Sequence, residues 1–398
     1  MKESTETNQS QPILIDTIAT ASGHAIGTLT LNDPKALNAL SVDMCQMISK
    51  QLSNWQNDDN IVAILLKGSG DKAFCAGGNI RKLYESMLDN PPMPNPYAEE
   101  FFSSEYSLFR QMHFYNKPIV LWANGIVMGG GMGLMAMCSH RVVTETTRFA
   151  MPEITIGLYP DATGSWLLQR FPAKLGLFLG LTGANCNGAD ALIGNMAEFA
   201  VTSEQYDDMV HALSSADWAN SADLHDTASQ ALATVHHTEQ LAESNLINHW
   251  QALQAIVNAG DIHAIDQVLQ NAELAEKYKD DKWMSRAIST YQHGCPVTAG
   301  LTFEAFKRAK KLSLEQILYM EMNLSLHCAN NPDFREGVRA LLIDKDRTPK
   351  WSKTLAECGG KEGRSYIDSH FNSPYDEGKH PFENWLDNGS KSADLVNI

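Results

Sequence analysis

Residues 118–139 form a stretch of 22 residues without a formally charged side chain, and this stretch limits the fold more than any other part of the sequence. It is long enough to cross a lipid bilayer, which takes about 20 apolar residues. However, it begins with Pro118, includes Asn124 and contains five glycines, at positions 125, 129, 130, 131 and 133. Because glycine weakens helices and favours tight turns, we expect a buried strand, a turn and a helix here rather than a membrane span.

Short apolar runs alternate with amphipathic stretches over residues 12–200. The runs AIGTLTL (25–31) and IVAILL (61–66) are typical of strands. A helix that Ser41 can cap is predicted between them. Its apolar residues recur at helical spacing: Met44, Ile48, Leu52 and Trp55. The alternation predicts a β-α-β unit and an α/β fold.

The rest of the chain differs in composition from this region. Residues 201–290 look wholly helical, a second helical pattern covers 300–345, and the last fifty residues are rich in loop-forming residues. We therefore expect four parts: a disordered tail at 1–11, an α/β core at 12–200, a helical region at 201–355 and a loop-rich extension at 356–398.

The net charge of −16 restricts the classes of partner. Nucleic acids and anionic membranes are bound through Lys and Arg that neutralise phosphates, so we predict neither as a partner. The acidic charge is localised, because residues 175–276 contain fourteen Asp and Glu but no Lys or Arg. Residues 345–353 carry a charge of +3 instead. A polyanionic ligand should therefore approach away from 175–276.

Seven cysteines in 398 residues are too few for a disulfide scaffold. No CxxC, HExxH or Cys/His cluster indicates zinc, so we expect no metal. The first residues, MKESTETNQSQ, lack the apolar stretch of a secretory signal, and their acids and absence of Arg argue against an organelle transit peptide. We therefore expect a cytoplasmic protein.

Two glycine turns, KAFCAGGNI (72–80) and MGGGMG (128–133), each follow a predicted strand. Glycine lets the backbone approach a ligand closely, and the first N–H groups of a helix are unpaired. Two such turns side by side could direct two N–H donors at one oxygen and form an oxyanion hole. The alternative is that these glycines serve only helix packing and tight turning.

Two carboxylates, Glu153 and Asp161, lie eight residues apart in the segment FAMPEITIGLYPDATGSW (149–166), which is mostly apolar and has no nearby Lys. Burial would raise the pKa of a carboxylate and suit it to acid/base chemistry near neutral pH. Alternatively, Glu153 and Asp161 stabilise the turns that follow Pro152 and Pro160.

Taken together, these motifs resemble the crotonase superfamily, also called enoyl-CoA hydratase/isomerase. The resemblance is carried by KAFCAGGNI, NGIVMGGGMGL and FAMPE in this order. Three further segments are similar to the 3-hydroxyisobutyryl-CoA hydrolase branch: LNDPKALNALS (31–41), FAMPEITIGLYPDATGSW and NPDFREGVRALLIDKDRTPKW (331–351). The resemblance to the family extends over residues 12–355 and is weakest over residues 201–290.

The resemblance implies a β-β-α spiral core followed by a helical C-terminal region. It also implies that the backbone N–H groups of Gly78 and Gly130 bind the thioester oxygen. Coenzyme A would be part of the substrate, with no separate cofactor, and would lie across residues 35–40 and 76–82. The residues expected to contact it are Lys35, Ala36, Leu37, Ala76, Gly78, Asn79 and Ile80. The superfamily commonly forms trimers, which would make this protein a homo-oligomer; the alternative is that the long helical additions cover the same surface within one chain.

The same resemblance implies functional roles for three acidic residues. Glu153 matches the catalytic glutamate of the family, Asp161 matches an acid that marks the hydrolase branch, and Glu105 matches a glutamate of the substrate pocket. Hydratases of the family carry a second glutamate where this sequence has Gly133, and hydration favours two carboxylates that hold one water. The expected activity is hydrolysis of 3-hydroxyisobutyryl-CoA in valine breakdown. An isomerase, a hydratase or a non-catalytic acyl-CoA-binding protein is the alternative.

Overall fold

The computed structural model describes residues 11–89 and 91–386, and these residues form two compact units. The first unit consists of Met1–Gly78, Ser107–Phe149 and Cys186–Asn245. The second consists of Asn79–Tyr106, Ala150–Asn185 and Leu246–Ile398. The predicted domain boundaries near 200 and 355 stay predictions, because the units are made of alternating stretches. The predicted disordered tail falls, apart from Gln11, outside the described residues.

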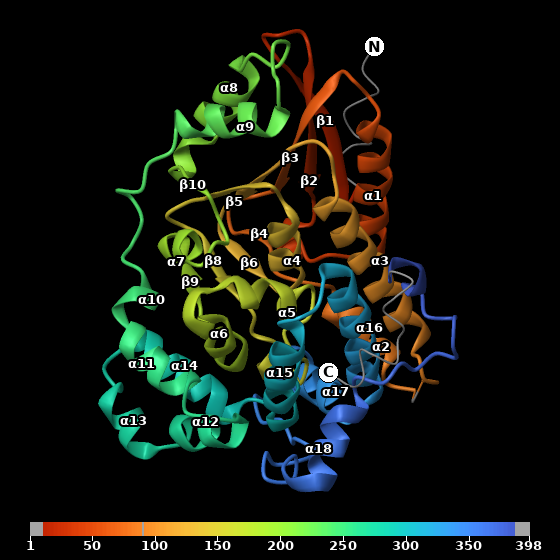
Figure 1. Cartoon of the computed structure of the whole chain (residues 1–398), viewed down its shortest axis with the longest axis vertical. Helices are drawn as coiled ribbons and strands as arrows, with labels where there is room; N and C mark the ends of the chain where they lie inside the picture. Colours follow the sequence, from red (N-terminus) through yellow and green to blue (C-terminus); the bar gives the residue numbers. More distant parts are fainter. Residues whose placement is uncertain (1–10, 90, 387–398) are drawn as a thin grey trace. The chain divides into compact units, whose positions relative to one another are not determined.

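The first unit contains two sheets of short strands (Figure 1). The larger sheet has the order β1-β2-β3-β5-β7-β10, in which only β1 and β2 are antiparallel. Its strands are β1 (Ile13–Ala19), β2 (Ala25–Leu31), β3 (Ile61–Gly68), β5 (Ile119–Ala123), β7 (His140–Val143) and β10 (Phe199–Ala200). The smaller sheet is β4 (Ala73–Cys75), β6 (Ile126–Met128), β8 (Arg148–Ala150) and β9 (Cys186–Asn187), in that order.

From β3 to β8, consecutive strands alternate between the two sheets. β3 is followed by β4, β5 by β6 and β7 by β8, and each pair places its first strand in the larger sheet and its second in the smaller one. The helix α4 (Gly130–Met137) follows the pair β5–β6. This repeated arrangement confirms the predicted α/β fold with a β-β-α spiral.

Both faces of the larger sheet are covered, which explains why every residue of β2 is buried. The helix α1 (Val42–Gln56) lies along β1 and β2, and Ser41 caps it by accepting a hydrogen bond from the Met44 N–H at 3.2 Å (Figure 1). A Cβ atom added at Gly27 would lie 2.7 Å from the Trp55 ring, so glycine allows α1 to pack closely on β2.

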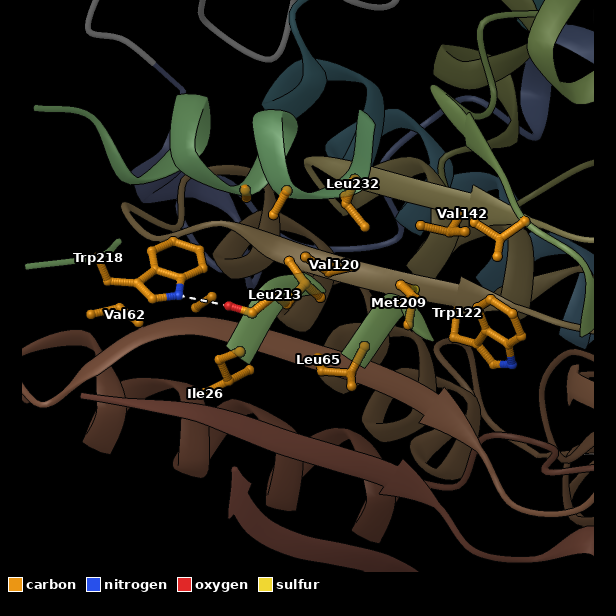
Figure 2. Packing of buried hydrophobic residues seen from close by; sticks show 14 residues of the cluster. Ile26, Val62, Leu65, Val120, Trp122, Val142, Met209, Leu213, Trp218 and Leu232 are labelled. Atoms are coloured by element: carbon orange, nitrogen blue, oxygen red, sulfur yellow. Dashed lines mark hydrogen bonds between the residues drawn. The ribbon is translucent and has the colours of Figure 1, made fainter. Parts of the chain in front are cut away.

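The helices α8 (Tyr206–Ser215) and α9 (Leu224–Ala233) cover the other face of the sheet. Figure 2 shows Met209, Leu213 and Leu232 of these helices directed at apolar side chains of β2, β3, β5 and β7. Trp218 is buried in the same cluster, and its indole N–H donates to the Leu213 carbonyl at 2.8 Å. Residues from the helical region predicted at 201–355 therefore form part of the core of the first unit.

The second unit is predominantly helical, as predicted for the C-terminal region. Its helices before residue 246 are α2 (Ile80–Ser86), the first part of α3 (Pro96–His113), η3 (Glu153–Thr155), α5 (Gly164–Leu167), η4 (Leu168–Arg170), η5 (Pro172–Lys174) and α6 (Leu175–Thr182). The later ones are α11 (Trp250–Val257), α12 (Ile262–Leu269), α13 (Ala272–Lys277), α14 (Lys282–His293), α15 (Pro296–Ala309), α16 (Leu314–Asn330), α17 (Pro332–Val338), η7 (Arg339–Ile343), α18 (Gly360–Ser369) and η8 (Glu383–Trp385). The first unit also contains three short helices: η2 (Pro34–Ala36), α7 (Gly188–Ile193) and η6 (Ser203–Gln205). A fourth short helix, α10 (Asn245–Asn248), begins at the last residue of the first unit and continues into the second.

Two helices form the interior of the second unit. Every residue of α6 is buried, as its sequence LGLFLGLT requires, and it packs against α11, α14 and α15. The helix α16 is buried along most of its length and begins with a capping box between Ser313 and Gln316.

The uncharged stretch at 118–139 forms β5, β6 and α4, as the glycine pattern predicts. Within residues 11–89 and 91–386, no helix has the length and apolar character needed to cross a membrane.

Candidate active site

The two glycine turns lie beside each other in the first unit because β4 and β6 are parallel neighbours. Cys75 pairs with Val127, so the chain leaves both strands at the same edge. A Cβ atom added at Gly77 would lie 3.4 Å from the Met128 carbonyl oxygen and 3.9 Å from the Gly130 nitrogen. Gly77 has φ of 110°, a conformation open mainly to glycine.

The backbone of the second turn approaches the first so closely that no side chain fits between them. A Cβ atom added at Gly131 would lie 2.3 Å from the Cys75 carbonyl oxygen. Gly130 is the first residue of α4, so its N–H has no acceptor within the helix. Among the described residues, the Gly78 N–H likewise makes no backbone hydrogen bond. Two N–H donors are thus left unpaired by turns of neighbouring strands.

The predicted coenzyme A segment at 35–40 is joined to the first turn by backbone hydrogen bonds. The Leu40 N–H donates to the Gly77 carbonyl at 2.8 Å, and the Ala76 N–H donates to the Leu37 carbonyl at 3.0 Å. Asn38 is fully buried and anchors the segment by donating to the carbonyls of Ser69 and Ala73. The structure therefore brings Leu37 next to Ala76.

Of the other residues predicted to contact coenzyme A, Lys35 and Ala36 belong to the short helix η2. Asn79 caps α2, in the second unit, by accepting a hydrogen bond from the Lys82 N–H at 3.4 Å, and Ile80 is the first residue of that helix.

Four carboxyl groups are buried in the second unit. Glu105 lies on α3, Glu153 begins η3, Asp161 precedes α5, and Glu321 lies on α16; they are 1%, 5%, 6% and 0% exposed, respectively. No ion pair is formed by any of the four within the described residues. The structure brings together all three acids predicted from the sequence and adds Glu321.

Burial raises the pKa of all four carboxyl groups. The pKa of Asp161 rises to about 7 and that of Glu321 to about 8. The pKa values of Glu105 and Glu153 lie well above their ordinary value, because of burial and then because of the negative charge of Asp161. Four neighbouring carboxyl groups do not readily carry negative charge at the same time, so some of them stay protonated near neutral pH.

The four carboxyl groups differ in how their oxygens are used. Within the described residues, Glu105 Oε1 and Glu153 Oε2 are buried without a hydrogen-bond partner. Both oxygens of Glu321, in contrast, accept backbone hydrogen bonds, from the N–H groups of Thr163 and Ser165 at 2.8 Å each. One oxygen of Glu105 and one oxygen of Glu153 therefore lack a hydrogen-bond partner among the described residues, whereas both oxygens of Glu321 accept hydrogen bonds.

A chain of hydroxyl groups reaches Asp161. Tyr106 donates to Asp161 Oδ2 at 3.5 Å, and its hydroxyl also lies 2.8 Å from Ser325 Oγ. The Tyr159 hydroxyl is 2.9 Å from the same Ser325 oxygen and 2.9 Å from the Glu321 carbonyl oxygen, to which it donates.

The loop from Glu153 to Asp161 has a defined path that glycine permits. Gly157 has φ of 74°, and a Cβ atom there would lie 2.3 Å from the Asp333 carbonyl oxygen. The Cys295 N–H donates to the Ile154 carbonyl at 2.9 Å. Glu153 Oε2 has no hydrogen-bond partner among the described residues, so this oxygen does not stabilise the turn after Pro152.

Sequence reasoning missed Glu321, Tyr106, Tyr159 and Ser325. A signal was present, since Glu321 and Ser325 stand four residues apart in the mostly apolar helix LEQILYMEMNLSL and therefore share one face. In the described residues no cluster of three or more His, Cys, Asp or Glu side chains is arranged to hold a metal ion.

A family model described as enoyl-CoA hydratase/isomerase matches residues 26–367. The chain belongs to the enoyl-CoA hydratase/isomerase family. The resemblance inferred from the glycine turns and FAMPE is thereby confirmed.

Curated relatives within this family share about a third of their residues with the chain. It is 38% identical over 354 residues to the 3-hydroxyisobutyryl-CoA hydrolase, mitochondrial, of Danio rerio, covering 87% of each chain. It is 36% identical over 350 residues to the protein of that name from Xenopus tropicalis, with 87% of this chain and 86% of the relative covered. The predicted cytoplasmic location is wrong by this comparison, because these relatives are named as mitochondrial.

Solved structures of the enoyl-CoA hydratase/isomerase family have the same fold. A carnitinyl-CoA dehydratase from Mycobacterium thermoresistibile superposes with a TM-score of 0.77 at 32% identity, covering 93% of this chain and all of that one. An enoyl-CoA hydratase from Rhodobacter sphaeroides 2.4.1 gives a TM-score of 0.75 at 29% identity, covering 91% of this chain and 97% of that one.

Proposed function

We propose that this enzyme hydrolyses 3-hydroxyisobutyryl-CoA to 3-hydroxyisobutyrate and free coenzyme A, a step of valine breakdown. The observation that carries the proposal is the buried group of Glu105, Glu153 and Asp161, in a chain whose curated relatives are named for this hydrolysis. Coenzyme A is part of the substrate, and no further cofactor takes part.

The thioester carbonyl is polarised by the N–H groups of Gly78 and Gly130. Attack on the carbonyl carbon moves negative charge to its oxygen, and donors fixed in place stabilise that charge without reorganisation. The support for this role is that turns of neighbouring parallel strands leave both N–H groups without an acceptor. The pantetheine and adenine parts of coenzyme A contact the segment 35–40 and the turn that follows Cys75.

Glu153 performs the attack or prepares it. In one route its carboxylate attacks the thioester carbon, the C–S bond breaks, and the coenzyme A thiolate leaves and takes up a proton; water then hydrolyses the mixed anhydride. In the other route Glu153 removes a proton from water as the water attacks, and that proton passes to the thiolate. The unpartnered Glu153 Oε2 is available for either role.

Asp161 and Glu105 recognise the rest of the acyl group. Burial raises the pKa of both, so neutral carboxyl groups that donate hydrogen bonds are present near neutral pH. Asp161 binds the 3-hydroxyl group of the substrate or places the hydrolytic water, and Glu105 supports this pocket.

A hydratase is the second candidate, because one solved relative is named as a hydratase. Hydration favours two carboxylates around one water. The residue that would supply the second one from α4 is Gly133, which is buried and has no side chain. Gly133 therefore counts against a hydratase, and it does not by itself choose between an isomerase and a hydrolase.

A thiol-release assay tests the proposal. Steady release of free coenzyme A from 3-hydroxyisobutyryl-CoA, detected with a chromogenic thiol reagent, is the expected result. Turnover of an enoyl-CoA without thiol release would show a hydratase or isomerase instead, and binding without any turnover would show a non-catalytic protein.

A further inference from the structure

The turn that follows Asp161 has a backbone conformation that L-amino acids rarely adopt. Ala162 has φ of 52° and Thr163 has φ of 67°. Both angles lie in the left-handed region, where a β-branched residue such as threonine is particularly unfavourable. Two such residues in succession require surrounding contacts that hold them, and this kind of strain is often found at functional sites.

Glu321 supplies those contacts from α16. Its Oε2 accepts the Thr163 N–H and its Oε1 accepts the Ser165 N–H, both at 2.8 Å. The intervening Gly164 N–H donates to the Asp161 carbonyl at 2.6 Å. The helix α5 has no side-chain cap of its own, so Glu321 takes the place of a cap from a distant part of the sequence.

The same helix also holds the side chain of Asp161. Ser325 lies one turn after Glu321, and its Oγ is 2.8 Å from the Tyr106 hydroxyl, which donates to Asp161 Oδ2. The backbone of Asp161 is therefore fixed through Glu321, and its carboxyl group is fixed through Tyr106 and Ser325.

We propose that Glu321 is a positioning residue for the hydrolysis: it does not touch the substrate, but it holds the strained turn that orients Asp161 toward the 3-hydroxyl group. The proposal rests on the proposed function. Glu321 is fully buried with both oxygens occupied, whereas Glu105 and Glu153 each keep one buried oxygen without a partner among the described residues. This contrast separates an orienting carboxyl group from those that act on substrate.

A double-mutant cycle on the full-length protein provides the main test. Glu321→Gln keeps the size of the side chain, but its amide NH₂ group faces one of the two backbone N–H donors. An NH₂ group cannot accept a hydrogen bond, so one of the two contacts to the turn is lost. We expect kcat for 3-hydroxyisobutyryl-CoA to fall ~10- to 100-fold with a small change in KM, because a small misplacement of a reacting group is costly. In the double variant with Asp161→Asn, turnover should be no lower than in Asp161→Asn alone. If the two losses multiply instead, Glu321 does not act through Asp161 and the proposal is overturned.

Glu304→Gln is the matched control. Glu304 is a buried carboxyl group of the same unit, but among the described residues its hydrogen bonds and ion pairs go to Lys307, Arg308 and Arg364, and none goes to the turn after Asp161. We expect this variant to lose stability, to leave kcat nearly unchanged and to combine independently with Asp161→Asn. If Glu321→Gln does not fold, Glu321→Asp replaces it in the cycle.

Hydrogen–deuterium exchange tests the contact without relying on activity. Peptides that cover residues 159–167 should exchange faster in Glu321→Gln than in the wild type, and Glu304→Gln should not have this effect. Unchanged exchange would overturn the proposal. A wild-type protein that releases no coenzyme A from 3-hydroxyisobutyryl-CoA would refute the proposed function, while exchange would still decide whether Glu321 holds the turn.

Discussion

Tyr106 Oη lies 2.8 Å from Ser325 Oγ, although 219 positions separate the two residues in the sequence. The contact joins α3 to α16 in the second unit. Because Tyr106 also donates to Asp161, it links the predicted acids to a helix that carries none of the family motifs recognised in the sequence. The acid group is thus built from three distant stretches of chain, and its properties depend on all of them.

Replacing Glu153 with Gln should abolish most of the turnover without unfolding the protein. An amide is neither a nucleophile nor a base, so we expect kcat to fall by at least ~10²-fold while KM changes little. Steady-state kinetics with 3-hydroxyisobutyryl-CoA measure this effect. Glu377→Gln, at an exposed position near the C-terminus, should keep wild-type rates. Similar rates for the two variants would remove Glu153 from the mechanism.

Stability should decrease as the pH rises above 7. Burial raises the pKa of Glu321 to about 8 and that of Glu105 well above its ordinary value, so the folded state binds more protons than the unfolded state. The stabilisation present below the ordinary pKa is lost as the pH rises through the folded values. Urea unfolding between pH 7 and 9 should show the decline. Glu105→Gln should reduce the slope by up to ~1.4 kcal/mol per pH unit, the value for one titrating group.

The pH range of this comparison lies above the pKa values of the buried histidines His140, His370 and His380, all of which burial lowers. Burial lowers the pKa of His370 to about 4 and that of His380 to about 3, so these groups act in the opposite direction below pH 6.5. A wild-type stability that is constant or rises between pH 7 and 9 would contradict the prediction.

Gly131→Ala should impair catalysis through the backbone. The added methyl group would lie 2.3 Å from the Cys75 carbonyl oxygen, so the start of α4 must move and take the Gly130 N–H with it. Loss of one oxyanion donor lowers kcat by ~10²- to 10³-fold. Gly23→Ala is the control, since Gly23 has φ of 83° but open space around it, and it should reduce stability without changing kcat. Wild-type kcat in Gly131→Ala would argue against an oxyanion hole at this turn.

Trp218→Ala should destabilise the first unit. The buried ring fills the cluster between α8, α9 and the sheet, and its removal loses both packing and the hydrogen bond to Leu213. Large-to-small changes of this kind cost about 3 to 5 kcal/mol in the free energy of unfolding. Trp218→Phe retains much of the apolar contact and should cost less. If chemical denaturation showed the same loss of unfolding free energy for Trp218→Ala and Trp218→Phe, packing of an aromatic ring at this position would not stabilise the cluster.

The sequence by itself determined the elements and the motifs that local chemistry controls. Strands at AIGTLTL and IVAILL, the helix capped by Ser41, and the turns at Gly77 and Gly129 follow from short-range preferences for strand, cap and left-handed backbone. The same local motifs sufficed to recognise the family and to select Glu105, Glu153 and Asp161 as candidates.

Only the tertiary structure decided which residues meet. Each unit is assembled from stretches that are separated in the sequence. The packing of α8 and α9 on the sheet and the hydrogen bond from the Thr163 N–H to Glu321 likewise depend on contacts between stretches far apart in the chain. The raised pKa values have the same origin, because desolvation and close negative neighbours appear only when the chain has folded. Sequence spacing carries no information about such burial, and a polar residue in a helix such as Glu321 therefore shows its role only in three dimensions.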